Sequence, residues 1–288
     1  MNILITGANG QLGNELRILS ESYQRHTYFF TDIDELDITD EKSVFLFIRE
    51  NNIKMVINAA AYTAVDNAED NHKQSHAINS IAPRTLARAI QNRGGFMIHI
   101  STDYVFDGTK YKPYNENDLT SPASIYGATK LAGEDNVLEN CRKSVIIRTS
   151  WLYSSFGNNF VKTMIRLGKE RDKLGVVIDQ IGSPTYAHDL AQVIFDIIEK
   201  GFVRGIFHFA NEGLCSWYDF AVTVHRLAGI TGCKVNPILT RDYPTKAKRP
   251  LYSVLDKTKI KETYDIEIPH WEESLIKCIE KLKGQEAD

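Results

Sequence analysis

Short, mostly apolar runs alternate with segments of helical periodicity along the first half of the chain. The runs cover residues 3–5, 28–30, 55–61 and 96–100. Between them, a segment that begins at Gln11 and the segments 40–51 and 77–92 space their apolar residues three and four positions apart, which predicts helices. Strands buried on both faces are apolar throughout, so this order predicts an α/β fold of the Rossmann type, with a doubly wound parallel sheet.

The second half of the chain continues with shorter elements. Helices are expected from about residue 160 to 169 and over residues 187–200 and 216–228, and strands over residues 176–178 and 206–209. In the last of these helices Phe220, Val224 and Leu227 form an apolar stripe, and His225 is expected at the surface or half-buried rather than as a ligand. We expect residues 1–150 to form a dinucleotide-binding Rossmann domain, to which residues 176–210 return. Residues 151–175 and 211–288 are expected to form mainly a smaller C-terminal substrate-binding subdomain.

Composition and charge exclude several classes of function. With 288 residues, 43% hydrophobic and 25% charged, the chain has the profile of an ordinary globular protein. A net charge of −3 gives no basic field for nucleic acid, and no apolar run approaches the roughly 18 to 20 residues that span a membrane. Met1 leads directly into the first strand and leaves no room for a signal peptide, so we expect a cytoplasmic protein. The four cysteines lie far apart and predict reduced thiols rather than a metal site.

The first strand runs into a turn that contains Gly7, Gly10 and Gly13. Glycines at this spacing allow a tight turn close to a pyrophosphate, whose charge the helix N-terminus stabilises. Asp32 follows nineteen residues after Gly13, at the end of the second apolar run, where a carboxylate can bind an adenosine ribose. This context predicts a dinucleotide site. A carboxylate with no arginine beside it repels a 2′-phosphate, so Asp32 slightly favours NADH over NADPH.

A second candidate group lies in the sequence YGATK, on a helix expected to begin near Ser124. Tyr126 and Lys130 are four residues apart and therefore share one face of that helix. A nearby ammonium lowers the pKa of a phenol toward neutrality. With a hydroxyl from Thr102 (or Ser101) at the end of a strand, these residues predict a proton-transfer group that can serve a carbonyl during its reduction.

Five segments in this order resemble the extended short-chain dehydrogenase/reductase family. They are TGANGQLG, NAAAYTAVDNAE, STDYVFDG, YGATKLAGE and RTSWLY, and the similarity continues through GNNFVKTM, DQIGSPTYAHDLA and AKRPLYSVL. The resemblance implies reduction, with NADH or NADPH, of the C4 keto group of a dTDP-linked 4-keto sugar destined for cell-surface polysaccharide. Hydride would come from the nicotinamide and the proton from Tyr126.

The resemblance also implies roles for individual residues. Residues implied to hold the cofactor are Gly7, Gly10, Gln11, Leu12 and Gly13 at the pyrophosphate, Asp37 and Ile38 at the adenine, and Ala59, Ala60, Ala61, Tyr62 and Thr63 along its path. Lys130 would bind the nicotinamide ribose, and Thr102 would hydrogen-bond the reacting oxygen. Thr102, Asp103 and Trp151 would contact the sugar, and Arg249 the diphosphate.

Other outcomes remain open at this stage. The same site could serve a nucleotide-sugar epimerase or dehydratase, or the fold could be a non-catalytic regulatory subunit. Some family members bind Mg²⁺ at a dimer contact through glutamates, but the corresponding position here is His188, so no metal is predicted. Homodimers are common in the family, and a homodimer stays open for this chain.

Overall fold

A six-stranded parallel sheet forms the centre of the protein, as seen in a computed structural model that describes residues 1–287. Its strands, in spatial order, are β10 (Gly205–His208), β5 (Ser144–Thr149), β4 (Phe96–Thr102), β3 (Met55–Asn58), β1 (Asn2–Thr6) and β2 (Thr27–Thr31). The chain leaves β1 toward β2 on one side and then crosses to β3 on the other. In open α/β sheets a ligand binds at such a switch point, outside the carboxyl ends of the strands.

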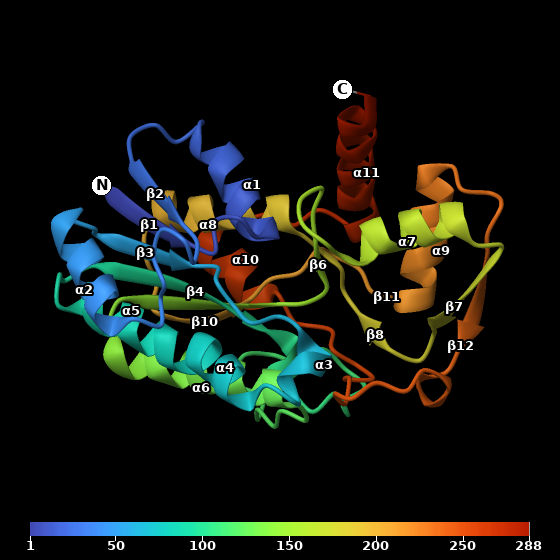
Figure 1. Cartoon of the computed structure of the whole chain (residues 1–288), viewed down its shortest axis with the longest axis horizontal. Coiled ribbons are helices and arrows are strands. Elements are labelled where there is room, and N and C mark those ends of the chain that lie inside the picture. Colours follow the sequence, from blue (N-terminus) through green and yellow to red (C-terminus); the bar gives the residue numbers. More distant parts are fainter. Residues whose placement is uncertain (288) are drawn as a thin grey trace.

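Helices cover both faces of the sheet, as Figure 1 shows. One face carries α1 (Gln11–Ser20), α8 (Ala187–Lys200) and α10 (Thr258–Tyr264), and the other carries α2 (Glu41–Glu50), α5 (Ala82–Gln91) and α6 (Ile125–Asn140). Successive side chains of a strand point to opposite faces. Ile3 and Ile5 accordingly pack in the first layer and Leu4 in the second, all fully buried. The predicted doubly wound parallel sheet is confirmed.

The helix predicted over residues 77–92 is longer and less regular than expected. It begins with α4 (His72–His76), passes through a π-helical turn, η1 (Ala77–Ile81), and continues as α5. The short helix α3 (Val65–Ala68) precedes it. Two strand ends also differ from the prediction, because β3 stops at Asn58 and β4 extends to Thr102. Ala59 to Ala61 therefore lie in the loop beyond β3.

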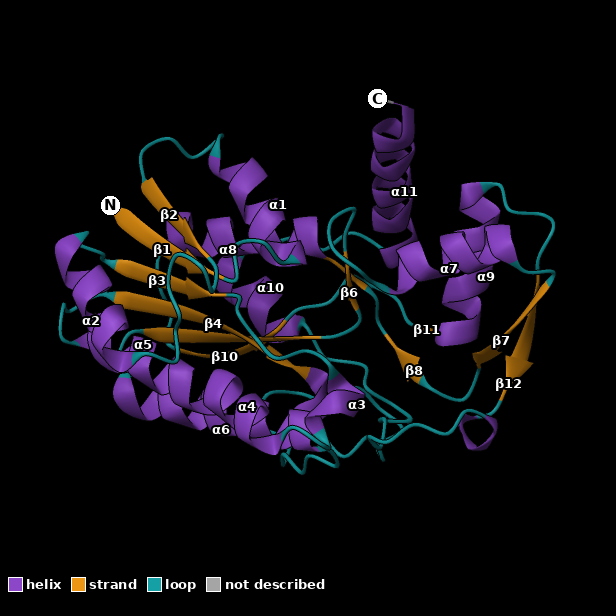
Figure 2. Cartoon of the chain, in the orientation of Figure 1, coloured by secondary structure: helices purple, strands orange, loops and turns teal. Residues whose placement is uncertain are grey.

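A second group of elements packs around its own apolar cluster, at the right of Figure 2. It contains helices α7 (Phe160–Glu170), α9 (Trp217–Ala228) and α11 (Trp271–Ala287) and the parallel pair β7 (Lys173–Val177) and β12 (Lys234–Ile238). Three shorter pieces are β8 (Ile181–Gly182), which pairs with β11 (Cys215–Ser216), and the η3 turn (Thr240–Asp242). β6 (Leu152–Tyr153) and β9 (Thr185–Tyr186) pair where the two groups meet.

The pairing of β7 with β12 changes one detail of the expected layout. The strand predicted at residues 176–178 does not join the central sheet, so the chain returns to that sheet with α8 and β10. The late helix α10 also packs against the central sheet, through Ile260 and Tyr264. The division into cofactor-binding and substrate-binding parts stays a prediction. Within residues 1–287, no helix is long and apolar enough to cross a membrane.

A buried ion pair ties α6 to β5 behind the candidate catalytic residues. The Arg148 guanidinium donates to both carboxylate oxygens of Glu134, with Nη2 2.7 Å from Oε2 and Nε 2.9 Å from Oε1. Ser101 donates a further hydrogen bond to Glu134. Both charged side chains are almost fully buried, and a buried charge that loses its partner is strongly destabilising.

Arg148→Met is expected to lower the free energy of unfolding by about 3 to 5 kcal/mol, because the Glu134 carboxylate then stays buried without its partner. Urea denaturation measures this. In the double variant Glu134→Leu/Arg148→Met most of the loss should be recovered. The matched control is Arg166→Met, which removes the exposed pair with Glu170 and should cost at most about 0.5 kcal/mol. Equal losses of unfolding free energy in Arg148→Met and Arg166→Met would contradict the view that burial makes the Glu134–Arg148 pair important for stability.

Candidate active site

The glycine turn brings β1 and β3 into close contact at the switch point. Gly7 has φ +70°, and a Cβ there would lie 2.6 Å from the backbone nitrogen of Ala60. A Cβ on Gly13 would lie 2.3 Å from the Gly7 carbonyl oxygen. Gly10 is the N-cap of α1, and no side chain caps the helix there. The turn thus exposes a helix N-terminus with room for a ligand against the backbone, which fits the pyrophosphate of a dinucleotide.

A cavity of about 970 Å³ opens beside this turn and runs across the carboxyl ends of the strands. It brings together most of the predicted site residues: Gly7, Gly10, Gln11, Leu12, Asp32, Asp37, Ile38, Ala59, Ala60, Ala61, Thr63, Thr102, Asp103, Tyr126, Lys130 and Trp151. Three predicted residues are not among its lining. Gly13 packs against the backbone of the turn, and the backbone of Tyr62 is held by the Asn79 side chain. Arg249 lies beyond the lining and is described below.

Several lining residues were missed by sequence reasoning. Gln74, Ala77 and Ile78 come from the helix that contains the π-helical turn, a feature that often marks functional sites. The motif GNNF precedes the predicted helix, and its residues Gly157, Asn158 and Asn159 also line the cavity. The Asn159 side chain caps α7 and donates to the Gln11 side chain at 3.0 Å.

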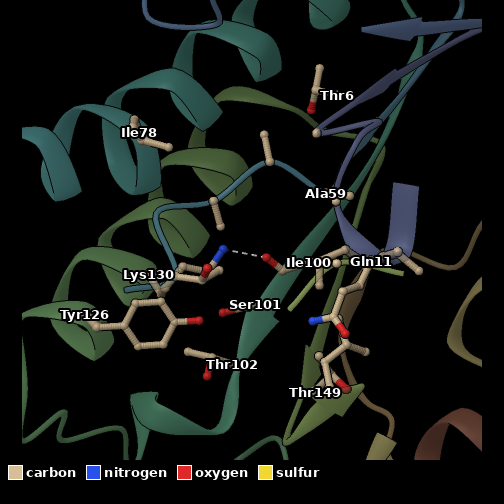
Figure 3. A pocket seen from close by; sticks show the side chains of 18 of the residues that line it. Thr6, Gln11, Ala59, Ile78, Ile100, Ser101, Thr102, Tyr126, Lys130 and Thr149 are labelled. Carbon is tan, nitrogen blue, oxygen red and sulfur yellow. Dashed lines mark hydrogen bonds between the residues drawn. The ribbon is translucent and has the colours of Figure 1, made fainter. Parts of the chain in front are cut away.

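The three predicted catalytic residues converge at the end of β4 (Figure 3). Ser124 caps α6 through the Gly127 amide, so Tyr126 and Lys130 lie in the first turns of that helix. The Tyr126 hydroxyl points toward the Thr102 side chain in Figure 3, and the Thr102 hydroxyl donates to Asp103 Oδ1. Lys130 Nζ donates to the Ile100 carbonyl oxygen at 2.6 Å. Of the two candidate hydroxyls, Ser101 donates to Glu134, whereas Thr102 lies in the cavity lining with Tyr126.

Burial controls the protonation of both groups on α6. It raises the pKa of Tyr126 above its ordinary value, and the nearby Thr102 side chain offsets only part of this rise. Burial lowers the pKa of Lys130 to about 8, against the opposing influence of Glu134. The expectation that Lys130 lowers the Tyr126 pKa is therefore wrong for this structure. A phenol that keeps its proton is suited to act as a general acid.

Asp103 is a buried carboxyl group next to this pair. It begins the short η2 turn (Asp103–Val105) that follows β4, and it is only 2% exposed. Its Oδ1 accepts a hydrogen bond from Thr102 at 3.1 Å, whereas Oδ2 has no partner among the described residues. Burial raises its pKa to about 6, although the neighbouring side chains of Ser253 and Thr102 oppose the rise. The free oxygen can accept a ligand hydroxyl.

Trp151 forms an aromatic wall where the two groups of elements meet. Its φ of +49° is uncommon for a residue with a side chain, and such strain persists only where the surroundings enforce it. The indole stacks on Trp217 of α9, with ring centroids 3.6 Å apart. A Cβ on Gly182 would lie 2.6 Å from the same indole. The ring is held from both sides and lines the cavity.

Arg249 lies near the cavity and is already paired with a carboxylate. Its Nη2 donates to Asp66 Oδ2 at 2.8 Å, and Nη1 lies 3.4 Å from the hydroxyl of Tyr104, which lines the cavity. The Nε atom is buried without a partner among residues 1–287. The guanidinium therefore has a free donor, although Asp66 neutralises part of its charge.

His188 belongs to a cluster around Glu15. The fully buried Glu15 carboxylate contacts His188 Nδ1 at 3.3 Å, Lys281 Nζ at 3.1 Å and Ser154 Oγ at 2.6 Å. Burial alone raises the Glu15 pKa, but the hydrogen bonds with His188 and Ser154 and the charge of Lys281 bring it below its ordinary value. No group of three His, Cys, Asp or Glu side chains within the described part of the chain could hold a metal.

Two smaller expectations have clear outcomes. All four cysteines are buried and free of disulfides. His225 was expected at the surface or half-buried, and this is wrong. It is 4% exposed, and its Nε2 lies 3.0 Å from the Met164 carbonyl oxygen of α7, so it is a structural link between α9 and α7.

Comparison with known proteins identifies the family. The model of the family described as RmlD substrate binding domain matches residues 1–283. The chain is 45% identical over 283 residues to the dTDP-4-dehydrorhamnose reductase of Aggregatibacter actinomycetemcomitans, which covers 95% of this chain and 96% of that protein.

Two crystal structures agree with this assignment over almost the whole chain. The dTDP-4-dehydrorhamnose reductase of Clostridium acetobutylicum has a TM-score of 0.94 and 47% identity, and the match covers 98% of this chain and 100% of that one. The dTDP-4-dehydrorhamnose reductase of Bacillus anthracis, in complex with NADP, has a TM-score of 0.93 and 41% identity, with 97% and 99% covered. The resemblance found in the sequence is confirmed: the chain belongs to the RmlD family of dTDP-4-dehydrorhamnose reductases.

Proposed function

We propose that the protein reduces the C4 keto group of dTDP-4-dehydro-L-rhamnose to give dTDP-L-rhamnose, with NADH or NADPH as the reductant. The observation that carries this proposal is the convergence of Thr102, Tyr126 and Lys130 at one end of a cavity whose other end is the glycine turn. A bound nicotinamide cofactor supplies the hydride. We further propose that the enzyme acts in the cytoplasm, where it supplies a nucleotide sugar for polysaccharide biosynthesis. Whether it forms a homodimer stays open.

The residues of the chain supply the proton and the orientation. As the carbonyl carbon accepts a hydride, its oxygen becomes negative and takes the proton from the Tyr126 hydroxyl. Thr102 would hydrogen-bond the same oxygen, since it lines the cavity with Tyr126. Because burial holds the Tyr126 pKa high, the phenol is protonated before the reaction. Lys130 would bind the ribose hydroxyls of the cofactor, since its ammonium already lies in the cavity wall.

The remaining site residues would position the two ligands. Gly7, Gly10, Gln11 and Leu12 would hold the pyrophosphate at the N-terminus of α1. The adenosine of the cofactor would lie against Asp32, Asp37 and Ile38. The rest of the cofactor would lie along Ala59, Ala60, Ala61 and Thr63. Thr102, Asp103 and Trp151 would contact the sugar. Arg249 would contribute to binding of the diphosphate with its free Nε, although Asp66 neutralises part of its charge.

The site residues give less support to a dehydratase or to a non-catalytic regulatory subunit. A dehydratase usually needs an acidic pair beside the catalytic hydroxyl, and here Asp103 is followed by Tyr104, whose hydroxyl lies near Arg249. A non-catalytic regulatory subunit would have no need for a buried lysine and a proton-bearing phenol in one cavity.

Tyr126→Phe is expected to reduce turnover by about 10² to 10⁴, the usual contribution of a positioned general acid, with little change in cofactor binding. The assay follows absorbance at 340 nm after addition of dTDP-4-dehydro-L-rhamnose, with NADH and then with NADPH. Tyr111→Phe, at a tyrosine that is 91% exposed, is the control and should behave as the wild type. A Tyr126→Phe variant that retains near wild-type turnover would show that the proton comes from elsewhere.

Trp151→Ala should weaken sugar binding and raise KM by about tenfold or more, because it removes the aromatic wall that Trp217 and Gly182 hold in place. Steady-state kinetics at saturating cofactor measure the change. The exposed Tyr243→Ala serves as a control for loss of an aromatic residue. An unchanged KM in Trp151→Ala would remove this residue from the sugar site.

Asp103 should make stability fall as the pH rises. Its pKa in the folded protein is about 6 and its ordinary value is 3.8, so between these values the folded state binds more protons than the unfolded state. The free energy of unfolding should therefore decrease from about pH 4 to about pH 6, by up to about 3 kcal/mol. Urea denaturation across this range should show that Asp103→Asn lacks the decrease. Asp135→Asn, at an exposed site on α6, should retain it, and an identical profile for Asp103→Asn would contradict the prediction.

A further inference from the structure

The segment 154–159 lies against the first turn of α1. It follows β6 and reads SSFGNN, and its last three residues line the cavity. Gly157 has φ +62°, and a Cβ on it would lie 3.1 Å from Gln11 Cγ. In Figure 3 Gln11 lies on the opposite side of the cavity from Tyr126 and Lys130. The second group of elements therefore reaches the helix N-terminus that would hold the pyrophosphate.

Two side chains of α1 bind this segment. Gln11 and Glu15 are four residues apart and share one face of the helix. Glu15 Oε1 accepts a hydrogen bond from Ser154 Oγ at 2.6 Å, and Gln11 Oε1 accepts one from Asn159 Nδ2 at 3.0 Å. Both ends of the segment are thus tied to α1, and the second contact joins two residues that line the cavity.

The hydrogen bonds of Asn159 determine which end of its amide faces Gln11. Its Oδ1 accepts from the backbone amide of Lys162 at 3.1 Å, and a backbone N–H group can only donate. Its Nδ2 lies 2.7 Å from the Ser154 carbonyl oxygen, which can only accept. A flipped amide would satisfy neither backbone group, so the nitrogen of Asn159 is the atom that faces Gln11.

The orientation of Asn159 in turn determines that of the Gln11 amide. Gln11 faces a donor and therefore presents its oxygen, so its Nε2 group is directed to the other side. Within residues 1–287 this nitrogen has no hydrogen-bond partner, and the half-buried Gln11 side chain belongs to the cavity lining. The cavity thus receives an N–H donor from Gln11 rather than a carbonyl oxygen.

We propose that Asn159 is a positioning residue for cofactor binding, because it holds the Gln11 amide with its N–H group toward a phosphate of the cofactor. This role deepens the proposed function and rests on it in one respect, that the glycine turn holds the pyrophosphate of a nicotinamide cofactor. Gln11 is the first residue of α1, where free backbone N–H groups and the helix dipole already favour an anion. An added N–H donor bonds the charged phosphate, whereas the oxygen of a flipped amide would repel it.

The test is a double-mutant cycle on cofactor binding, with no sugar substrate present. Dissociation constants for NADH and NADPH are obtained from quenching of tryptophan fluorescence. Gln11→Met keeps a side chain of similar length without the donor, and it should raise both dissociation constants by about tenfold or more, because a hydrogen bond to a charged acceptor is lost. Gln11→Glu has the shape of the wild-type side chain but turns a carboxylate oxygen toward the phosphate, and it should weaken binding further.

Asn159→Ser keeps a good cap for α7 but is too short to reach Gln11. It should raise both dissociation constants by about three- to tenfold, because the Gln11 amide is then free to turn. In the Gln11→Met background the same exchange should have no further effect, since Asn159 acts through Gln11.

Two controls separate positioning from a general loss of structure. Asn51→Ser makes the same exchange at a half-buried asparagine outside the cavity lining, where Nδ2 donates to the Phe47 carbonyl oxygen, and both dissociation constants should stay within about twofold. The second control is competition by ADP and by adenosine. Gln11→Met and Asn159→Ser should weaken binding of ADP and leave that of adenosine, which has no phosphate, within about twofold.

Additive effects in the cycle would overturn the role of Asn159, because this residue would then act independently of Gln11. Unchanged dissociation constants in Gln11→Met would overturn it as well, and so would equal weakening of ADP and adenosine. Each of these results leaves the reductase proposal intact, since the wild type still binds the cofactor. A wild-type protein that binds neither NADH nor NADPH would instead overturn both the role of Asn159 and the proposed function.

Discussion

The contact between β1 and β3 at the switch point is the constraint on which the rest of the site depends. The backbone of Gly7 lies so close to the backbone of Ala60 that a Cβ at Gly7 would not fit. The chain therefore leaves β1 through a residue with positive φ, and α1 begins a few residues later. That turn aims the N-terminus of α1 into the space above β3, where Ala59 to Ala61 have too little side chain to fill it. A larger side chain at these positions would take up part of the cavity.

At the catalytic end of the cavity, burial shifts the pKa values of Tyr126 and Lys130 more than neighbouring charges do. Tyr126 and Lys130 share a helix face, yet Lys130 is held by the Ile100 carbonyl, and each group moves toward its neutral form. A neutral phenol suits the reductive direction, in which the group must give up a proton. The ion pair of Glu134 and Arg148 lies directly behind, and its rigidity fixes α6 against β4 and β5.

The first half of the fold could be predicted because its determinants are local. Continuous apolar strands, the glycine turn and the Ser124 cap each act through residues close in sequence. The prediction failed where contacts between segments distant in sequence determine the structure. β7 pairs with β12 some sixty residues later, and His225 is buried because α7 supplies a carbonyl oxygen for its ring. Neither partner can be identified from the periodicity of the segment itself.

The same distinction explains which site residues were found. Thr102, Tyr126 and Lys130 occur in short motifs, whereas Ile78 enters the cavity through a π-helical turn that has no signature in the sequence. Trp151 was found by resemblance, but its support by Trp217 and Gly182 appears only in three dimensions. The aromatic wall at Trp151 is thus built from the segment after β5, from β8 and from α9. The position of the Trp151 ring therefore depends on the packing of both groups of elements, so the shape of this end of the cavity is set by the stability of the whole chain.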